Sequence, residues 1–207
     1  MKTLLNLFKL RIGVVITFTA LAAAAITPGA PLSAWKMLVL ALSVMIASAS
    51  AGAFNQYVER DIDARMARTR RRPFVTGALV HDARWLWLIM GLTTAAVLAA
   101  GWALNALSAL YVFLGAFFYA IVYTVWLKRR TWMNIVVGGL SGSFAVLAGA
   151  AAVAPGLPPE PLILALVLFL WTPPHFWSLA IAYRDDYVAA GVPMLPAVIG
   201  AKRSAQV

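Results

Sequence analysis

The sequence predicts an all-α membrane protein, built as a polytopic bundle of transmembrane helices. Three observations indicate this class. The chain of 207 residues is 63% hydrophobic, with a mean hydropathy of +0.85. Its apolar runs approach the roughly 20 residues that a helix needs to cross a hydrocarbon core of about 30 Å. Charged residues make up only 12% of the chain and lie mostly between these runs.

We expect six spans, near residues 12–32, 36–56, 85–104, 107–127, 135–154 and 162–182. These segments should be helices, because unpaired backbone N–H and C=O groups find no water inside a bilayer. The first segment is long and runs into Pro28-Gly29-Ala30-Pro31 instead of a clear cleavage site, so we do not expect a cleaved signal peptide. Residues 1–207 are expected to form a single membrane domain.

The basic residues predict an orientation. With a cytoplasmic N-terminus, 16 of the 17 Lys and Arg residues fall on the cytoplasmic side, and only Lys36 falls outside. Such asymmetry is typical of plasma-membrane proteins, including those of a bacterial inner membrane. Basic loops of this kind contact anionic lipid, so the net charge of +10 does not predict a nucleic-acid partner. The absence of cysteine excludes disulfides, thiolate nucleophiles and cysteine-ligated metals.

Carboxylates are rare in the chain and are clustered. Five of the seven lie in two short stretches, Glu59, Asp61 and Asp63, then Asp185 and Asp186. The predicted topology places both clusters on the cytoplasmic side. Acidic residues beside hydrocarbon are costly and usually serve a cation, a proton relay or a substrate.

The first cluster follows a helical spacing. Asn55, Glu59 and Asp63 are four residues apart, so they should line one face of a helix and offer oxygen ligands to a hard cation such as Mg²⁺. Asp61 should lie on the opposite face, within reach of Arg60, Arg65 or Arg84. The alternative is that these are solvated charges at a helix end. Two observations argue against this alternative. The helix macrodipole disfavours acids at a helix C-terminus, and a merely solubilising surface has no need of the Asn55 amide.

Basic stretches adjoin the acids. Arg68-Thr69-Arg70-Arg71-Arg72-Pro73 follows the first cluster, and Lys128-Arg129-Arg130-Thr131 occupies the next cytoplasmic loop. Mg²⁺ on one side and Arg or Lys on the other is a common way to bind a diphosphate. If Asp185 and Asp186 lie beside the first cluster, the two could hold a pair of Mg²⁺ ions. The alternative is that these basic residues only set topology and contact lipid.

The chain resembles a known family through four ordered motifs. It is similar to the UbiA-type intramembrane prenyltransferases, and among them to the protohaem IX farnesyltransferase (haem O synthase) family. The motifs are Asn55-x3-Glu59-x3-Asp63 with Arg68-Thr69 and Arg72-Pro73; Tyr123-Thr124-x-x-Leu127-Lys128-Arg129-Arg130-Thr131; Trp171-Thr172-Pro173-Pro174-His175-Phe176-Trp177; and Asp186-Tyr187-x3-Gly191-Val192-Pro193-Met194-Leu195-Pro196. Glu59 stands where the family usually has Asp.

The resemblance implies a fold and a reaction. The family pattern has about nine helices, so roughly three C-terminal helices are expected to be missing from this chain. The implied reaction is the Mg²⁺-dependent ionisation of farnesyl diphosphate and transfer of the farnesyl group to a vinyl group of protohaem IX (haem B), giving haem O. The implied protein partners are haem A synthase or terminal oxidase assembly factors.

The resemblance also implies roles for individual residues. The implied catalytic and metal-binding residues are Asn55, Glu59, Asp63 and Asp186, with Asp185 as a further metal ligand. The implied diphosphate-binding residues are Arg68, Arg72, Lys128 and Arg129. His175 is implied to contact haem iron or propionates, whereas in general a lone helical histidine more often packs with a hydrogen bond. The proline pair before His175 frees backbone carbonyls, so the motif should lie beside a cavity.

Three alternatives to this reaction remain open at this stage. One is a prenyltransferase with an aromatic acceptor, such as a quinone precursor, and the pattern around His175 is what distinguishes the two reactions. An ion- or proton-coupled transporter would need ionisable residues near the bilayer midplane, where the spans offer only His175. An inactive fragment or haem-assembly protein would accord with the missing C-terminal helices.

Overall fold

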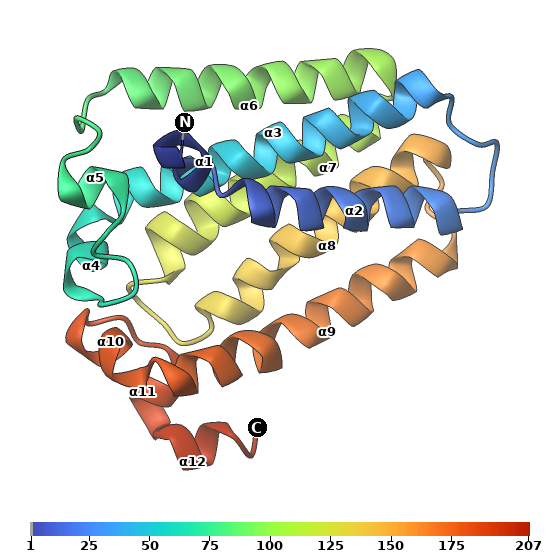
Figure 1. Cartoon of the computed structure of the whole chain (residues 1–207). Coiled ribbons are helices and arrows are strands. Elements are labelled where there is room, and N and C mark those ends of the chain that lie inside the picture. Colours follow the sequence, from blue (N-terminus) through green and yellow to red (C-terminus); the bar gives the residue numbers. More distant parts are fainter. Residues whose placement is uncertain (1) are drawn as a thin grey trace.

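Six long helices lie side by side in the computed structural model, which describes residues 2–207 (Figure 1). The elements are α1 Lys2–Leu7, α2 Leu10–Ile26, α3 Ala34–Val58, α4 Arg60–Arg65, α5 Pro73–Thr76, α6 Arg84–Ala103, α7 Ala106–Phe117, the π-helix η1 Phe118–Leu127, α8 Asn134–Val153, α9 Pro159–Ala182, α10 Arg184–Ala189, α11 Leu195–Ile199 and α12 Ala201–Ser204. The predicted all-helical class is confirmed for the described part of the chain.

Five of the helical segments are long and apolar enough to cross a membrane: α3, α6, α7 with η1, α8 and α9. Their bounds lie within three residues of the predicted spans. The sixth, α2, has 17 residues and ends at Ile26, so the span predicted for 12–32 was too long at its C-terminal end. Thr27 turns to an extended conformation there, and the prolines that follow at Pro28 and Pro31 prevent the helix from resuming.

Small residues allow the helices to approach closely. Helix α8 packs against α2, α7 and α9, while α3 packs against α2 and α6. The buried core between them is rich in alanine, including Ala20, Ala47 and Ala148. At Gly149 the helices α2 and α8 come so close that a β-carbon would overlap the carbonyl oxygen of Ala20. Such packing of small residues is typical of helix pairs in membranes, where apolar lipid tails compete with large side chains.

The outer helices turn large apolar side chains outward. Trp87 and Trp102 on α6 are 72% and 81% exposed, and Ile163 and Leu170 on α9 are 61% and 59% exposed. A water-soluble protein would not leave whole apolar helix faces uncovered, whereas a bilayer covers them. The chain is therefore a multi-pass membrane protein.

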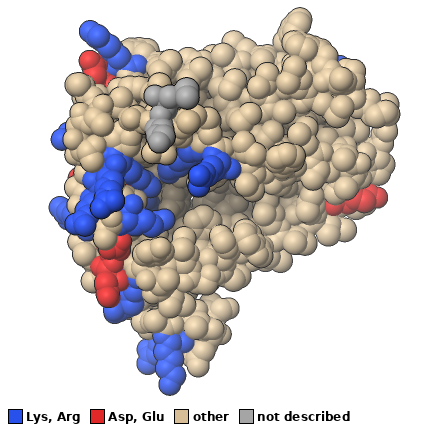
Figure 2. All heavy atoms as spheres, in the orientation of Figure 1, with Lys and Arg blue, Asp and Glu red and all other residues tan. Residues whose placement is uncertain are grey.

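Charged side chains gather at one end of the bundle, around α4, α5 and α10, beside a hollow in the surface (Figure 2). We call this the polar end. Helix α7 reaches it through η1, where the N–H of Lys128 bonds to the carbonyl of Tyr123 at 2.9 Å, five residues back. π-Helical turns are rare and often occur at functional sites.

Candidate active site at the polar end of the bundle

The predicted stripe of Asn55, Glu59 and Asp63 is present and buried. These residues are 2%, 0% and 1% exposed, respectively. Helix α3 ends at Val58, yet the N–H of Glu59 bonds to the carbonyl of Asn55 at 3.0 Å and the N–H of Asp63 to that of Glu59 at 2.8 Å. The helical repeat thus continues into α4 and keeps the three side chains on one face. Their burial excludes the alternative that they are solvated charges.

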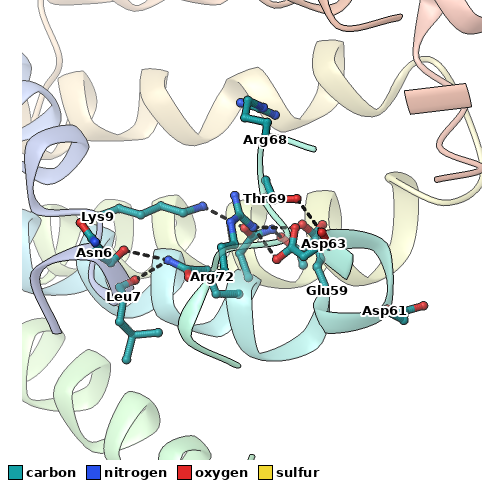
Figure 3. A network of polar contacts seen from close by, with 12 residues as sticks. Asn6, Leu7, Lys9, Glu59, Asp61, Asp63, Arg68, Thr69 and Arg72 are labelled. Carbon is teal, nitrogen blue, oxygen red and sulfur yellow. Dashed lines mark hydrogen bonds and ion pairs between the residues drawn. The ribbon is translucent and has the colours of Figure 1, made fainter. Parts of the chain in front are cut away.

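Each member of the stripe is bound by a basic side chain. The Lys9 ammonium donates to Asn55 Oδ1 at 2.9 Å, and Lys128 donates to Glu59 Oε2 at 2.5 Å. Arg72 donates from Nη1 to both carboxylate oxygens of Asp63, at 2.9 and 2.7 Å. Figure 3 shows Lys9 and Arg72 reaching this cluster from different segments of the chain. Two of these basic side chains therefore pair with the two carboxylates, and Lys9 binds the neutral amide of Asn55.

Burial shifts the pKa values of this cluster. It raises the pKa of Asp63, and the adjacent Arg72 guanidinium acts in the opposite direction. Burial lowers the pKa of Lys9 to about 7, and repulsion from Arg72 and Lys128 adds to that effect. Both shifts indicate a site from which water is largely excluded, where charge interactions are strong.

One oxygen of the cluster remains available to a ligand. Among the described residues, Glu59 Oε1 is buried and accepts no hydrogen bond. An unsatisfied buried carboxylate oxygen is costly, and a cation would satisfy it. The Asn55 amide oxygen and the carboxylates of Glu59 and Asp63 are a hard-oxygen set of the kind that Mg²⁺ prefers. The donor types therefore suit a magnesium ion, and Glu59 Oε1 is the one oxygen of this set that no basic side chain of residues 2–207 occupies.

The second acidic cluster is arranged differently. The Asp186 carboxylate accepts the N–H groups of Ala67 and Arg68 at 3.2 and 3.3 Å, so it joins α10 to the loop after α4. Asp185 has a 99% exposed side chain, and its contact is with Arg184 at 3.5 Å. Successive side chains on a helix point about 100° apart, so α10 turns one aspartate to the loop and the other to the surface.

The two acidic clusters therefore adjoin without merging. Within residues 2–207, no group of three Asp, Glu or His side chains is close enough to hold a metal ion. The expectation that the two clusters together hold a pair of Mg²⁺ ions stays a prediction.

Arg129 lies outside the buried cluster. Its guanidinium makes two bonds of 2.8 and 2.7 Å to the carboxylate of Asp61, and both side chains are about half exposed. The expectation that Arg60, Arg65 or Arg84 pairs with Asp61 was wrong. Arg84 instead lies 3.6 Å from Asp82. The ion pair between Arg129 and Asp61 links the loop after η1 to α4, and this link holds the neighbouring Lys128 in position.

A cavity of about 410 Å³ leads from the polar end into the bundle. At the polar end it is lined by Lys9, Asn55, Arg68, Arg72 and Lys128. Glu59 and Asp63 lie behind this basic layer, because their bonds to Lys128 and Arg72 cover them.

The rest of the cavity wall is aromatic and aliphatic. The rings of Tyr119 and Tyr123 contact Lys9 and Lys128, respectively. The other lining residues include apolar side chains of α2, α3, α7, α8 and α9, such as Val15, Val44, Val112, Ala145, Leu168 and Trp171. A basic head and an apolar body suit one amphiphilic ligand with an anionic head group, and the volume is within the range for small-molecule sites.

The motif around His175 borders this cavity. Trp171, Thr172 and Phe176 are lining residues, which confirms the expectation of a cavity beside the proline pair. His175 itself is exposed and is not part of the lining; its ring stacks on Trp171 with centroids 4.2 Å apart. The proposed haem contact of His175 stays a prediction.

Sequence reasoning missed several residues of the site. Lys9 was assigned only to membrane topology, although it reaches the centre of the cluster. Tyr119 accepts a bond from Lys9 at 3.3 Å, and Thr124 accepts one from the Asn55 amide at 3.1 Å. Thr124 lies in the second motif but was given no role, and Tyr119 lies four residues before that motif begins, in the same helical segment.

Comparison with known proteins identifies the family. The model of the UbiA prenyltransferase family matches residues 16–207. Protoheme IX farnesyltransferase 2 of Paramagnetospirillum magneticum is 62% identical over 198 residues, which cover 96% of this chain and 69% of that protein. Protoheme IX farnesyltransferase 1 of the same organism is 51% identical, with 97% of this chain and 70% of that protein covered.

Solved structures show the same fold. A UbiA homologue from Archaeoglobus fulgidus, bound to DMAPP and Mg²⁺, matches with a TM-score of 0.83 at 18% identity, over 98% of this chain and 71% of that one. The apo structure of a UbiA homologue from Aeropyrum pernix K1 matches with a TM-score of 0.79 at 22% identity, over 94% of this chain and 72% of that one. The fold, the motifs and the identities agree, and the chain belongs to the UbiA prenyltransferase family, among the protoheme IX farnesyltransferases.

Proposed function

We propose that this protein transfers the farnesyl group of farnesyl diphosphate to a vinyl group of protohaem IX, giving haem O. The observation that carries the proposal is the cavity, whose basic end continues into an apolar body as a prenyl diphosphate requires. The names of the relatives at 62% and 51% identity support farnesyl as the donor and protohaem as the acceptor.

The reaction divides into steps that this site can assist. The bond between farnesyl C1 and the diphosphate oxygen breaks, and the diphosphate leaves with the bonding electrons. A vinyl carbon of haem then forms a bond to C1, water adds its hydroxyl to the other vinyl carbon, and one proton is released. The side chains needed are those that stabilise negative charge on the leaving group, because the protein supplies no nucleophile.

Arg68, Arg72 and Lys128 would bind the diphosphate, and their support is that all three line the polar end of the cavity. Arg68 is oriented by a 3.2 Å bond to the Tyr187 hydroxyl and by the Tyr183 ring, 5.3 Å away. Arg72 and Lys128 would exchange their carboxylate partners for phosphate oxygens when the substrate enters. This exchange would free Asp63 and Glu59 for a metal ion.

The metal would be Mg²⁺, held by Asn55, Glu59 and Asp63. Its support is the buried free oxygen of Glu59 and the Mg²⁺ reported with DMAPP and with GPP in the A. fulgidus homologue. When bound, it would neutralise the charge that develops on the leaving diphosphate. Asp186 would act from α10, by holding the loop that carries Arg68 in place.

The polar end is proposed to face the cytoplasm. The support is the basic asymmetry of the sequence, with only Lys36 at the other end. Accessibility of single-cysteine variants to a membrane-impermeant maleimide tests this, because the chain has no cysteine of its own. A cysteine at position 70 should react only in inverted vesicles, and one at position 36 only in right-side-out vesicles.

The activity is tested by supplying farnesyl diphosphate, Mg²⁺ and haem B to membranes that contain the protein. Mass spectrometry should detect haem O, and chelation of Mg²⁺ with EDTA should abolish it. Prenylation of an aromatic acceptor in place of haem would identify the aromatic-acceptor alternative. Binding of farnesyl diphosphate without transfer to either acceptor would contradict the proposed reaction.

A further inference from the structure

We propose that Lys9 is a further ligand for the substrate diphosphate, held in the cavity by the segment that joins α1 to α2. This inference rests on the proposed function. Lys9 lines the polar end of the cavity together with Arg72 and Lys128, yet it comes from the N-terminal segment, far from them in the chain. The tertiary structure therefore brings its ammonium group to the site.

Lys9 differs from the other two cations in its partners. Arg72 and Lys128 each bind a carboxylate, at 2.7 and 2.5 Å. Lys9 donates to the neutral amide oxygen of Asn55 and to the Tyr119 hydroxyl, and within residues 2–207 it forms no ion pair with a carboxylate. A cation shielded from water without a counter-ion favours an anionic ligand. When it is protonated, Lys9 therefore carries a charge that none of the described acids of the site pairs with.

The backbone conformation at Lys9 directs its side chain toward the cavity. Lys9 adopts a left-handed conformation, with φ 46° and ψ 43°, which L-residues other than Asn and Asp rarely adopt. The turn separates α1 from α2 and lets the side chain run along α3. There, Gly52 leaves room for it, because a β-carbon at Gly52 would lie 3.3 Å from Lys9 Cδ.

Two anchors hold this turn in place. Leu7 is fully buried in a cluster with Ala53, Phe74 and Ile89. The side-chain amide of Gln56 donates to the carbonyl oxygens of Asn6 and Leu7, both at 2.9 Å. Figure 3 shows Asn6 and Leu7 at this anchor, with Lys9 extending from them toward the cluster. These contacts compensate for the unfavourable backbone conformation and keep the ammonium in the cavity.

A membrane-anchoring role would require a different geometry. A lysine that sets topology extends its ammonium to water and lipid head groups. Lys9 instead turns inward to Asn55, one of the residues of the proposed metal site. A diphosphate spreads its charge over several oxygens, and cations on several sides bind it better than one pair does. Lys9 approaches from the turn between α1 and α2, Arg72 from the loop after α4, and Lys128 from the end of η1.

The experiment compares two ligands that share a farnesyl chain. Affinities of the purified protein in nanodiscs are measured for farnesyl diphosphate with Mg²⁺ and for farnesol, which lacks the diphosphate. Lys9→Met keeps much of the side-chain length and removes the charge. It should therefore weaken the affinity for farnesyl diphosphate by roughly 10- to 100-fold and leave the affinity for farnesol unchanged. Lys9→Arg should retain binding within a few fold. The matched control is Lys202→Gln, which removes an exposed charge on α12 and should change neither affinity.

The outcomes separate the inference from the function on which it rests. An equal loss of affinity for both ligands in Lys9→Met would show that Lys9 only supports the fold, and would overturn the inference. Undiminished binding of farnesyl diphosphate in that variant would overturn it as well, while the proposed function would stand. Failure of the unmodified protein to bind farnesyl diphosphate would contradict the proposed function and this inference together.

Discussion

The two acidic clusters at the polar end have similar compositions and opposite environments. In the first, Glu59 and Asp63 are buried and each carboxylate binds one cation of the cavity wall. In the second, Asp186 binds backbone N–H groups of a loop, and Asp185 is exposed. Burial makes the difference, because removing water strengthens every charge interaction and raises the cost of any charge left unpaired.

The first cluster therefore supplies charged groups that pair with the cations of the cavity wall, and the second holds a loop in position. Asp186 holds the loop that presents Arg68 to the cavity, so its effect on the site is indirect. Asp61 is a third case, exposed and paired with Arg129. If this comparison is correct, substitutions should have effects that decrease from the buried pairs to the loop contact and then to the exposed pair.

The largest effect is expected from Lys128→Met. It would leave the buried Glu59 carboxylate without a partner, at a cost of about 3–5 kcal/mol in the free energy of unfolding. Thermal unfolding in detergent measures the loss. The double variant Lys128→Met/Glu59→Gln should recover part of it, because no charge is then left unpaired. A double variant as unstable as the single one would show that Lys128 stabilises the fold by packing and not by its charge.

Asp63→Asn should have the next largest effect, on the reaction. The substitution removes a charge that binds Arg72 and, by our proposal, Mg²⁺, so haem O formation should fall about 100- to 1,000-fold. The control is Asp185→Asn, which changes an exposed aspartate and should leave the rate unchanged. Equal losses in both variants would mean that the environments of the two clusters do not determine their roles.

Asp186→Asn should have an intermediate effect that is confined to the loop. The loss of charge weakens two hydrogen bonds to the N–H groups of Ala67 and Arg68, by about 1–2 kcal/mol in total. The freed loop contains many arginines, so limited trypsin digestion should cleave it faster. Trypsin cleavage at an unchanged rate would show that Asp186 does not hold the loop.

Asp61→Asn should have the smallest effect, no more than about 0.5 kcal/mol, because the exposed pair with Arg129 is screened by water and salt. The hydrogen bond from Arg129 lowers the pKa of Asp61 below its ordinary value of 3.8. The contribution of the pair to stability is therefore present above that value and is lost as the pH falls through the lowered pKa. Thermal unfolding at neutral pH should show a difference of that small size between Asp61→Asn and the unmodified protein, and an even smaller one at high salt. A loss comparable to that of Lys128→Met, and unchanged by high salt, would place Asp61 with the buried cluster.

The site could be predicted from sequence only where the signal was local. Asn55, Glu59 and Asp63 were found because helical periodicity relates residues four apart, and the continued i→i+4 bonds preserve that relation. The proline pair marked the cavity for a similar reason, since missing backbone donors are visible in the sequence. The position of Asp185 was not predictable, because it depends on how α10 packs.

The sequence alone determined the helical membrane class and the approximate spans, because a long apolar run has few other solutions in a bilayer. It also determined the asymmetry of charge that separates the polar end from Lys36. Both properties depend on composition over short stretches of chain, and neither requires knowledge of which helices are neighbours.

Only the tertiary structure decided which cation neutralises which acid. Lys128 reaches Glu59 across 69 positions and Arg129 reaches Asp61 across 68. Lys9, which pairs with no acid in the described part of the chain, reaches the amide of Asn55 across 46. The basic residues outnumber the acids, so the sequence permits many pairings. Helix packing selects one set, because a charge held away from water is tolerated only where a partner of suitable geometry lies beside it.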